Sequence, residues 1–127
     1  MNSEPAYTLN EQQGFVRVTF AGGTLVTPQM VMEVIDLENL RYGTKRLNAL
    51  WDFRGCLPPE HFGFNDMDDI VQHVQIQSGF KWSPRVALLI EADVQYGLSR
   101  MYQMLVEGFP TEVDIFYDES EALAWVR

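Results

Sequence analysis

The stretch RVALLIEADVQYGLSRMYQML, residues 85–105, decides the fold. Its first part, Arg85–Glu91, is a short apolar run, which is typical of a strand buried on both faces of a sheet. Asp93 can cap the helix that follows, whose apolar positions from Val94 to Leu105 recur at helical spacing. A strand that runs directly into a helix is the unit of an open α/β sheet, and ligands bind such sheets at the carboxyl ends of the strands. This junction is therefore a candidate site.

The chain before this stretch begins with a hairpin. Polar EQQG separates the strand-like runs AYTLN and GFVRVTFAG, which predicts two antiparallel strands. Thr27 before Pro28 predicts the start of a helix, whose apolar stripe runs to Leu40. Apolar LNALWDF, residues 47–53, predicts a central strand.

The remaining elements complete a regular alternation of strands and helices. Asn65 can cap a helix that closes near Gly79, and EVDIFY predicts a last strand. Asp118 with Glu121 forms a capping-box pair at the start of a C-terminal helix. The order ββαβαβαβα implies parallel strands joined by right-handed crossovers. We therefore predict one α/β domain over residues 1–127, with a single mixed, mainly parallel sheet of about five strands.

Composition and charge limit the classes of function. The 127 residues are 46% hydrophobic, which suits one domain with an apolar core rather than a disordered chain. A net charge of −9 opposes binding to nucleic acid and to anionic lipid surfaces. The apolar runs are too short to span a bilayer, the N-terminus has no signal-peptide pattern, and Cys56 is the single cysteine. We expect a cytoplasmic protein without membrane insertion.

Three stretches carry a resemblance to a known family: YGLSRMYQML (Tyr96–Leu105), VDIFYDESEALAWVR (Val113–Arg127) and LWDFRG (Leu50–Gly55). They are similar to the SpoIIAA-like family, within the superfamily of STAS and Sec14-type domains, whose members resemble a bacterial anti-sigma factor antagonist. Members of this family carry a YGLARM-like helix start, and they end in an aromatic–acidic turn followed by an EALAWL-like helix. The fold that the resemblance implies has the order of elements predicted above.

One departure from the family pattern removes a regulatory device. Sigma-pathway antagonists present a phosphorylatable serine at the start of the second helix, after the strand that here reads LNALWDF. The corresponding residues 54–69, RGCLPPEHFGFNDMDD, contain no serine or threonine. The resemblance therefore implies the scaffold and a preference for protein partners, without the phosphoserine switch.

Tyr96, Gly97 and Arg100 open the helix after the apolar run, on the same sheet edge as Asp52. One hypothesis places helix-end amides, a phenol and a guanidinium around a polar or anionic group, with Gly97 allowing a close approach. The alternative is that Tyr96 packs on a neighbouring loop and Arg100 offsets acids of its own chain such as Asp93. Asp52 has a similar alternative, which is an ion pair with the arginine two residues further on.

Two loops carry aromatic residues on either side of one predicted helix. CLPPEHFGF holds Phe62 and Phe64 on a path stiffened by two prolines, and SGFKWSP holds Phe80 and Trp82. Exposed aromatic side chains on such loops form a contact surface or the mouth of a pocket. The alternative is that they fold back onto the core.

Neither metal binding nor catalysis has a complete set of residues. His61, His73 and nearby acids could suggest a metal, and His73 lies four residues from Asp69 on one helix face. No second cluster completes a tetrahedral site, and the helix dipole already explains carboxylates at a helix N-terminus. Cys56 follows a strand, yet neither histidine is placed as its base, and no GxSxG motif is present. We expect no metal, no cofactor and no catalytic residues.

The leading functional prediction is a non-catalytic cytoplasmic interaction or regulatory module that binds a protein partner or forms a homodimer. The alternative is a binder of a small apolar or lipid-like ligand, by analogy with the Sec14-type branch. An uncharacterised enzyme is the third hypothesis. The first requires exposed aromatic loops, the second an enclosed apolar cavity of about 300 Å³ or more, and the third polar groups with shifted pKa values in a cleft.

Overall fold

The structure, a computed structural model, describes residues 5–76 and 82–127. The elements follow the predicted order: β1 (Tyr7–Gln12), β2 (Phe15–Phe20), α1 (Pro28–Tyr42), β3 (Asn48–Asp52), α2 (Phe64–Ile76), β4 (Arg85–Leu89), α3 (Asp93–Leu105), β5 (Glu112–Phe116) and α4 (Glu119–Val126). The predicted α/β fold with one mixed sheet is confirmed. No helix among the described residues is long and apolar enough to cross a membrane.

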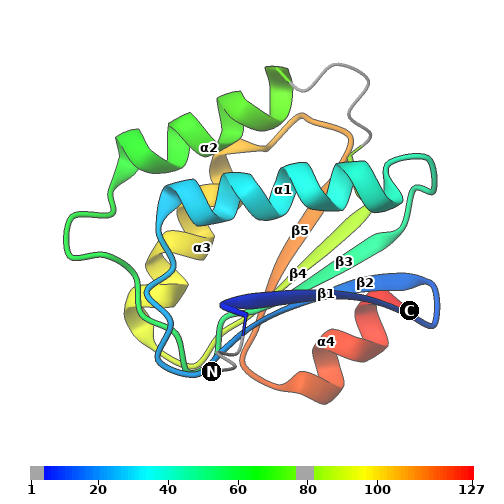
Figure 1. Ribbon diagram of the computed structural model, residues 1–127, viewed down its shortest axis with the longest axis horizontal. Helices are drawn as coiled ribbons and strands as arrows, with labels where there is room; N and C mark the ends of the chain where they lie inside the picture. Colours follow the sequence, from blue (N-terminus) through cyan, green and yellow to red (C-terminus); the bar gives the residue numbers. More distant parts are fainter. Residues whose placement is uncertain (1–4, 77–81) are drawn as a thin grey trace.

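The sheet has the strand order β1-β2-β3-β4-β5. β1 is antiparallel to β2, and the other neighbouring strands are parallel. Each parallel strand is added beside the previous one in the same direction, so crossovers of one hand leave all their helices on one face. Figure 1 shows this arrangement, with α1, α2 and α3 on one face of the sheet and α4 on the other.

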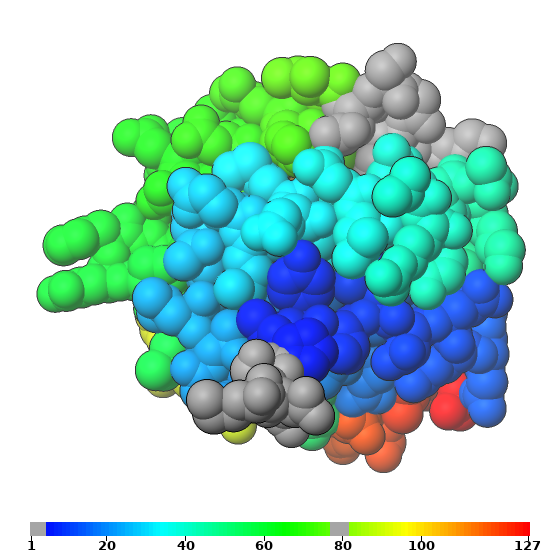
Figure 2. Space-filling view, viewed as in Figure 1, coloured from blue at the N-terminus to red at the C-terminus, as the bar shows by residue number. Residues whose placement is uncertain are grey.

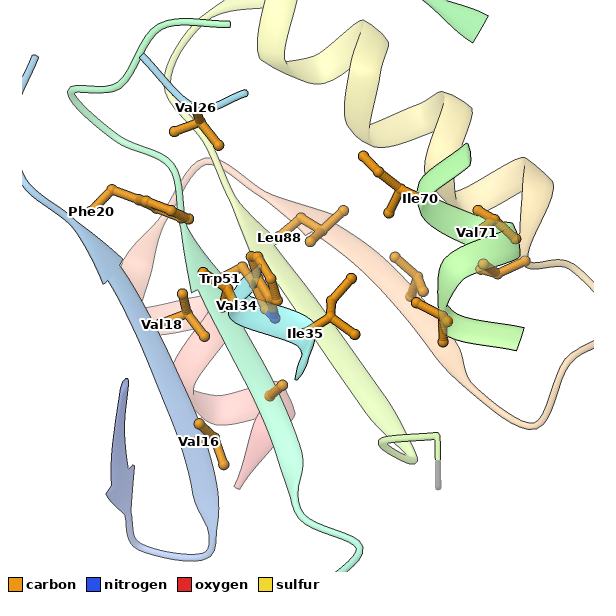
Figure 3. Close-up of a cluster of buried hydrophobic side chains, with 14 of the residues drawn as sticks. Val16, Val18, Phe20, Val26, Val34, Ile35, Trp51, Ile70, Val71 and Leu88 are labelled. Atoms are coloured by element: carbon orange, nitrogen blue, oxygen red, sulfur yellow. The ribbon is translucent and has the colours of Figure 1, made fainter. Parts of the chain in front are cut away.

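Alternation along the strands divides the core into two layers. The three-helix face carries side chains of β2, β3 and β4 that meet α1 and α2 (Figure 3): Val16, Val18, Phe20, Trp51 and Leu88 from the strands, with Val34, Ile35, Ile70 and Val71 from the helices. The α4 face carries the residues that alternate with them and the inner side of α4: Phe15, Leu50, Ala87, Leu89, Ala122 and Val126. Successive strand residues point to opposite faces, so one short strand serves both layers.

Two of the predicted helix caps are confirmed and two are wrong. Thr27 Oγ1 accepts a hydrogen bond from the backbone N of Met30 at 3.1 Å, and Asp118 Oδ1 accepts one from a backbone N of α4. Asn65 does not cap α2, because the helix begins one residue earlier, at Phe64. Asp93 does not cap α3 either, because it is already the first helical residue.

The apolar stripes of α1 and α3 are narrower than predicted. Leu40 is 81% exposed and Val94 is 56% exposed. Each lies five positions from a buried residue of its helix, Ile35 in α1 and Ser99 in α3, which places it about 140° further round the helix. These two side chains therefore point to solvent. The predicted close of α2 near Gly79 lies outside the described residues.

Candidate functional site

An apolar cavity of about 130 Å³ lies on the three-helix face. The sheet and the three helices on this face each supply part of its wall. The sheet contributes Trp51 and Leu88, while α1, α2 and α3 contribute residues such as Ile35, Ile70 and Leu98. Described residues that precede α1, α2 and β4, such as Val26, Phe62 and Trp82, add to the lining. The cavity therefore lies where three separate helices meet one surface of the sheet.

The loop from β3 to α2 is fixed at its base. Gly55 turns the chain with φ +78°, a conformation that favours glycine, and its carbonyl accepts a hydrogen bond from Gly23 N at 2.7 Å. Leu57 N donates to Thr24 O at 3.0 Å, and Val26 N donates to Leu57 O at 2.9 Å. These bonds hold the part of the loop that lines the cavity. Beyond them the segment that leads into α2 (green in Figure 2) projects from the side of the molecule.

Gln95 joins this loop to the junction between β4 and α3. Its Oε1 accepts hydrogen bonds from the backbone N of Glu91 (2.8 Å) and of Ala92 (3.1 Å). Its Nε2 donates to the carbonyls of Phe53 (2.7 Å) and Cys56 (3.1 Å). This buried amide therefore satisfies backbone groups of both segments. Gln95 was not among the predicted site residues, although its neighbours were and a glutamine in a helix's first turn is a known capping residue.

Glu38 is an acidic residue of the cavity wall that, like Gln95, was not among the predicted site residues. It projects from α1 and lines the cavity. The residue is half-buried, but its Oε2 is fully enclosed and has no hydrogen-bond partner among the described residues. Burial raises the pKa of Glu38 to about 7. The signal was an acid three residues after Ile35 and four after Val34, on the apolar side of the predicted helix.

Tyr102 of α3 lines the same cavity. Burial raises the pKa of its phenol well above the usual range, and the negative charge of Glu38 raises it further. The phenol is therefore neutral throughout the range in which Glu38 titrates. The cavity thus combines mainly apolar walls with one carboxyl group that changes charge near neutral pH.

The predicted aromatic loops separate into inward and outward residues. Phe62 and Trp82 are half-buried and line the cavity. Trp82 also stacks on Phe109, with ring centroids 5.1 Å apart. Phe64 is 56% exposed at the start of α2. Phe80 lies outside the described residues.

Tyr96, Gly97 and Arg100 lie on the outer side of α3. Tyr96 is exposed and stacks on Tyr117, with centroids 6.3 Å apart. A Cβ atom added at Gly97 would meet no described protein atom within 4 Å, so no described segment of the chain packs closely against it. Arg100 Nη1 donates to Gln103 Oε1 at 2.5 Å, on its own helix.

Asp52 belongs to an ion-pair network on the α4 face. Its Oδ2 lies 3.0 Å from Arg17 Nη2 and 2.8 Å from Arg54 Nη2. Both arginines also contact Glu119 Oε1 of α4, at 2.7 Å and 2.6 Å respectively. Asp52 is therefore engaged by its own chain, as the alternative of an ion pair with Arg54 predicts. Its partners are Arg17 and Arg54, whereas Tyr96 stacks on Tyr117 and Arg100 bonds to Gln103, so these residues and Asp52 do not form one site.

The network sets the charge of its two acids. Burial alone would raise the pKa of Asp52, but hydrogen bonds from Arg54 and Arg17 outweigh it and hold this pKa below its usual range. Hydrogen bonds, chiefly from Arg17, lower the pKa of Glu119. Both carboxylates are therefore ionised at neutral pH, opposite two arginines.

The histidines and the cysteine do not form a joint site. His73 Nε2 lies 2.8 Å from Asp36 Oδ1, on the neighbouring helix α1. Cys56 lines the cavity, and burial raises the pKa of its thiol, which makes it a poor nucleophile. Within residues 5–76 and 82–127, no group of three or more His, Cys, Asp or Glu side chains is placed to hold a metal ion.

The fold has a counterpart among solved structures. No protein-family model and no curated protein matches the sequence. The chain is similar in structure to an uncharacterized protein from the DUF3478 family with a SpoIIAA-like fold from Shewanella loihica PV-4. The TM-score is 0.57, with 19% sequence identity over 100% of this chain and 99% of that chain. The chain has a SpoIIAA-like fold. At this identity the likeness establishes the SpoIIAA-like fold alone, and it confirms the fold that the resemblance implied.

Proposed function

We propose that the protein is a non-catalytic binding module that takes a small, mainly apolar molecule into the cavity on the three-helix face. The cavity of about 130 Å³ carries this proposal. Apolar cavities of roughly 150 Å³ hold a molecule the size of benzene. The cavity is smaller than the enclosed space of about 300 Å³ that the sequence-based alternative of a lipid-like ligand requires, so that requirement is not met. Its volume suits a ligand with one ring or a short branched chain.

The apolar lining of the cavity supports a role in binding. The cavity is partly open to solvent, and most of the surface that it exposes is apolar. A ligand that removes these walls from water is stabilised by about 25 cal/mol per Å² of apolar surface that it covers.

Toluene is a suitable probe, because it is neutral and matches the cavity in size. Saturating toluene should raise the melting temperature of the wild type and shift the NMR signals of residues that line the cavity. Val31→Phe fills the cavity from α1 and should abolish both effects. Leu40→Phe is the matched control, because it adds the same ring to the same helix at an exposed position outside the cavity.

The proposal fails if toluene leaves the wild type unchanged in both measurements. It also fails if Val31→Phe, checked to be folded by circular dichroism, responds to toluene as strongly as Leu40→Phe does. Either result would show that toluene does not enter this cavity.

A second candidate function is the protein interaction module of the leading sequence prediction. Tyr96 and Tyr117 favour it, since the two stacked rings are 43% and 54% exposed on the outer surface. Exposed aromatic pairs are common at the centre of protein interfaces. Sedimentation equilibrium tests for a homodimer: a dimer formed through this pair should dissociate in Tyr96→Ser. A single cysteine, which allows no disulfide within the chain, suits a cytoplasmic site of action for either function.

A further inference from the structure

We infer that the ligand of the cavity carries an ammonium group that pairs with the carboxylate of Glu38, so that the protein binds small amines with an apolar ring or branched chain. This inference rests on the proposed function, because it presupposes that the cavity takes a ligand. It specifies the charge and the polar group that this ligand carries.

The distribution of charge in the wall carries the inference. Among the described residues that line the cavity, Glu38 is the only acid, and none is a lysine, arginine or histidine. Within residues 5–76 and 82–127, its Oε2 has no hydrogen-bond partner. Buried polar atoms are nearly always paired, and each exception requires an explanation. A terminal carboxyl group turns easily about its last bond, so either oxygen can meet a donor on a ligand.

The chemistry of Glu38 selects among ligand classes. A carboxylate ligand would bring a like charge against Glu38, which is unfavourable. A purely apolar ligand would leave the carboxyl group unsatisfied. An ammonium group supplies both the opposite charge and up to three hydrogen-bond donors.

Two further features favour a cation. Trp51, Phe53, Phe62 and Trp82 line the cavity, and the faces of aromatic rings attract ammonium groups. The net charge of −9 gives the whole molecule a field that draws cations toward it. The same field disfavours acids such as fatty acids.

The surroundings of Glu38 determine how binding depends on pH. Tyr102 faces it from α3, and Cys56 lines the same cavity from the loop after β3. Tyr42 and Arg46 line a smaller hollow of about 20 Å³ that Glu38 also borders, and Arg46 makes no ion pair with Glu38. Burial is the cause of the raised pKa of about 7, so below this pH the carboxyl group is mostly protonated. Amine binding should therefore release a proton in this range.

The test compares three probes that share one ring: benzylamine, benzyl alcohol and benzoate. Isothermal titration calorimetry at pH 8 should give benzylamine an affinity about tenfold or more above that of benzyl alcohol, with benzoate weakest. Glu38→Gln should remove this preference and leave the affinity for benzyl alcohol within about threefold. Glu33→Gln is the control, because it removes an exposed acid of the same helix that lies outside the cavity.

A pH series on the wild type provides a second measurement. Only the ionised form of Glu38 binds the ammonium group, so the affinity of the wild type for benzylamine should be about tenfold weaker at pH 6 than at pH 8. The affinity for benzyl alcohol should not fall in the same way. In Glu38→Gln the pH dependence for benzylamine should disappear.

The outcomes separate this inference from the proposed function. If benzyl alcohol binds the wild type as tightly as benzylamine, or if benzylamine shows no loss of affinity at pH 6, the ammonium inference is overturned while the binding function stands. If none of the three probes nor toluene binds the wild type, the proposed function is overturned and the inference falls with it.

Discussion

The two faces of the sheet differ in how completely their side chains are packed and their polar groups are paired. On the α4 face one short helix lies against the strands, its buried side chains are closely packed, and the acids and arginines beside it are paired. On the three-helix face three longer helices share the surface, and a cavity remains between them, with a carboxyl oxygen that no group in the described part of the chain hydrogen-bonds. We interpret the α4 face as the side that stabilises the sheet and the three-helix face as the side that binds.

Leu88 and Leu89 test this comparison most strongly, because they are neighbours on β4 that point to opposite faces. Leu89 is fully buried on the α4 face, so Leu89→Ala should lower the free energy of unfolding by about 3–5 kcal/mol. Leu88 already borders the cavity and has fewer contacts to lose. Leu88→Ala should therefore cost about 1–2 kcal/mol less. Urea denaturation of the two variants measures the difference.

Equal losses for the two leucines, or a larger loss for Leu88→Ala, would contradict the comparison. The denaturant dependence of each variant should match that of the wild type, since a changed slope would report a change in the unfolded state instead.

Asp52→Ala should produce the next largest effect, a loss of about 2–3 kcal/mol at pH 7, because it leaves Arg17 and Arg54 without their most buried partner. This loss of stability should depend on pH. The folded-state pKa of Asp52 lies below its unfolded value of about 3.9, so its stabilising contribution is complete above that pH. The contribution is lost as the pH falls through the lower, folded-state pKa.

The stability curves of wild type and Asp52→Ala should therefore converge in acid, which urea melts between pH 7 and pH 2 would show. Asp114→Ala is a matched control, since this exposed aspartate of β5 makes no ion pair with any described residue. A gap between the curves that stays constant with pH would show that Asp52 acts through packing rather than charge.

The strand and helix pattern was predictable from sequence because it is local. Alternation in β2 and the apolar run of β4 each lie within a few residues, and the Thr27 and Asp118 caps need only their own first turn. The predicted Asp93 cap was wrong because Gln95 reaches back to the backbone before α3 and begins the helix one residue earlier.

The cavity was not predictable, because it depends on contacts between distant segments. Glu38 and Tyr102 come close to each other only in the folded protein, because two strands and a helix separate them in the sequence. Phe62 and Trp82 were named as candidates, but sequence alone left their direction open. In the folded protein both line the cavity.

Glu38→Met should give an effect of opposite sign to Asp52→Ala. The pKa of Glu38 is raised to about 7 from an unfolded value of about 4.3, so folded protein loses stability as the pH rises between these values. Replacing the carboxyl group with an apolar one should therefore stabilise the protein by about 2 kcal/mol at pH 8 and by less than about 1 kcal/mol at pH 5.

Thermal and urea melts of wild type and Glu38→Met at pH 5 and pH 8 measure this difference. Glu33→Met, at an exposed position of the same helix, should change stability little at either pH. A loss of stability in Glu38→Met at pH 8 would mean that the carboxylate has favourable interactions, and the contrast between the two faces would then not extend to their acids.

Arg100→Ala should have the smallest effect, because this arginine lies outside both layers. Arg17 is held between two acids with a side chain only 16% exposed, whereas Arg100 is exposed and makes its hydrogen bond to Gln103 on the same helix. The sequence-based placement of Arg100 at the helix start is wrong, because α3 begins at Asp93 and Arg100 lies in its middle, beyond the reach of the helix dipole. We expect a change below about 0.5 kcal/mol in urea melts and unchanged binding of toluene. A loss above about 1 kcal/mol, or altered sedimentation of the variant, would instead make the outer surface of α3 a third functional region.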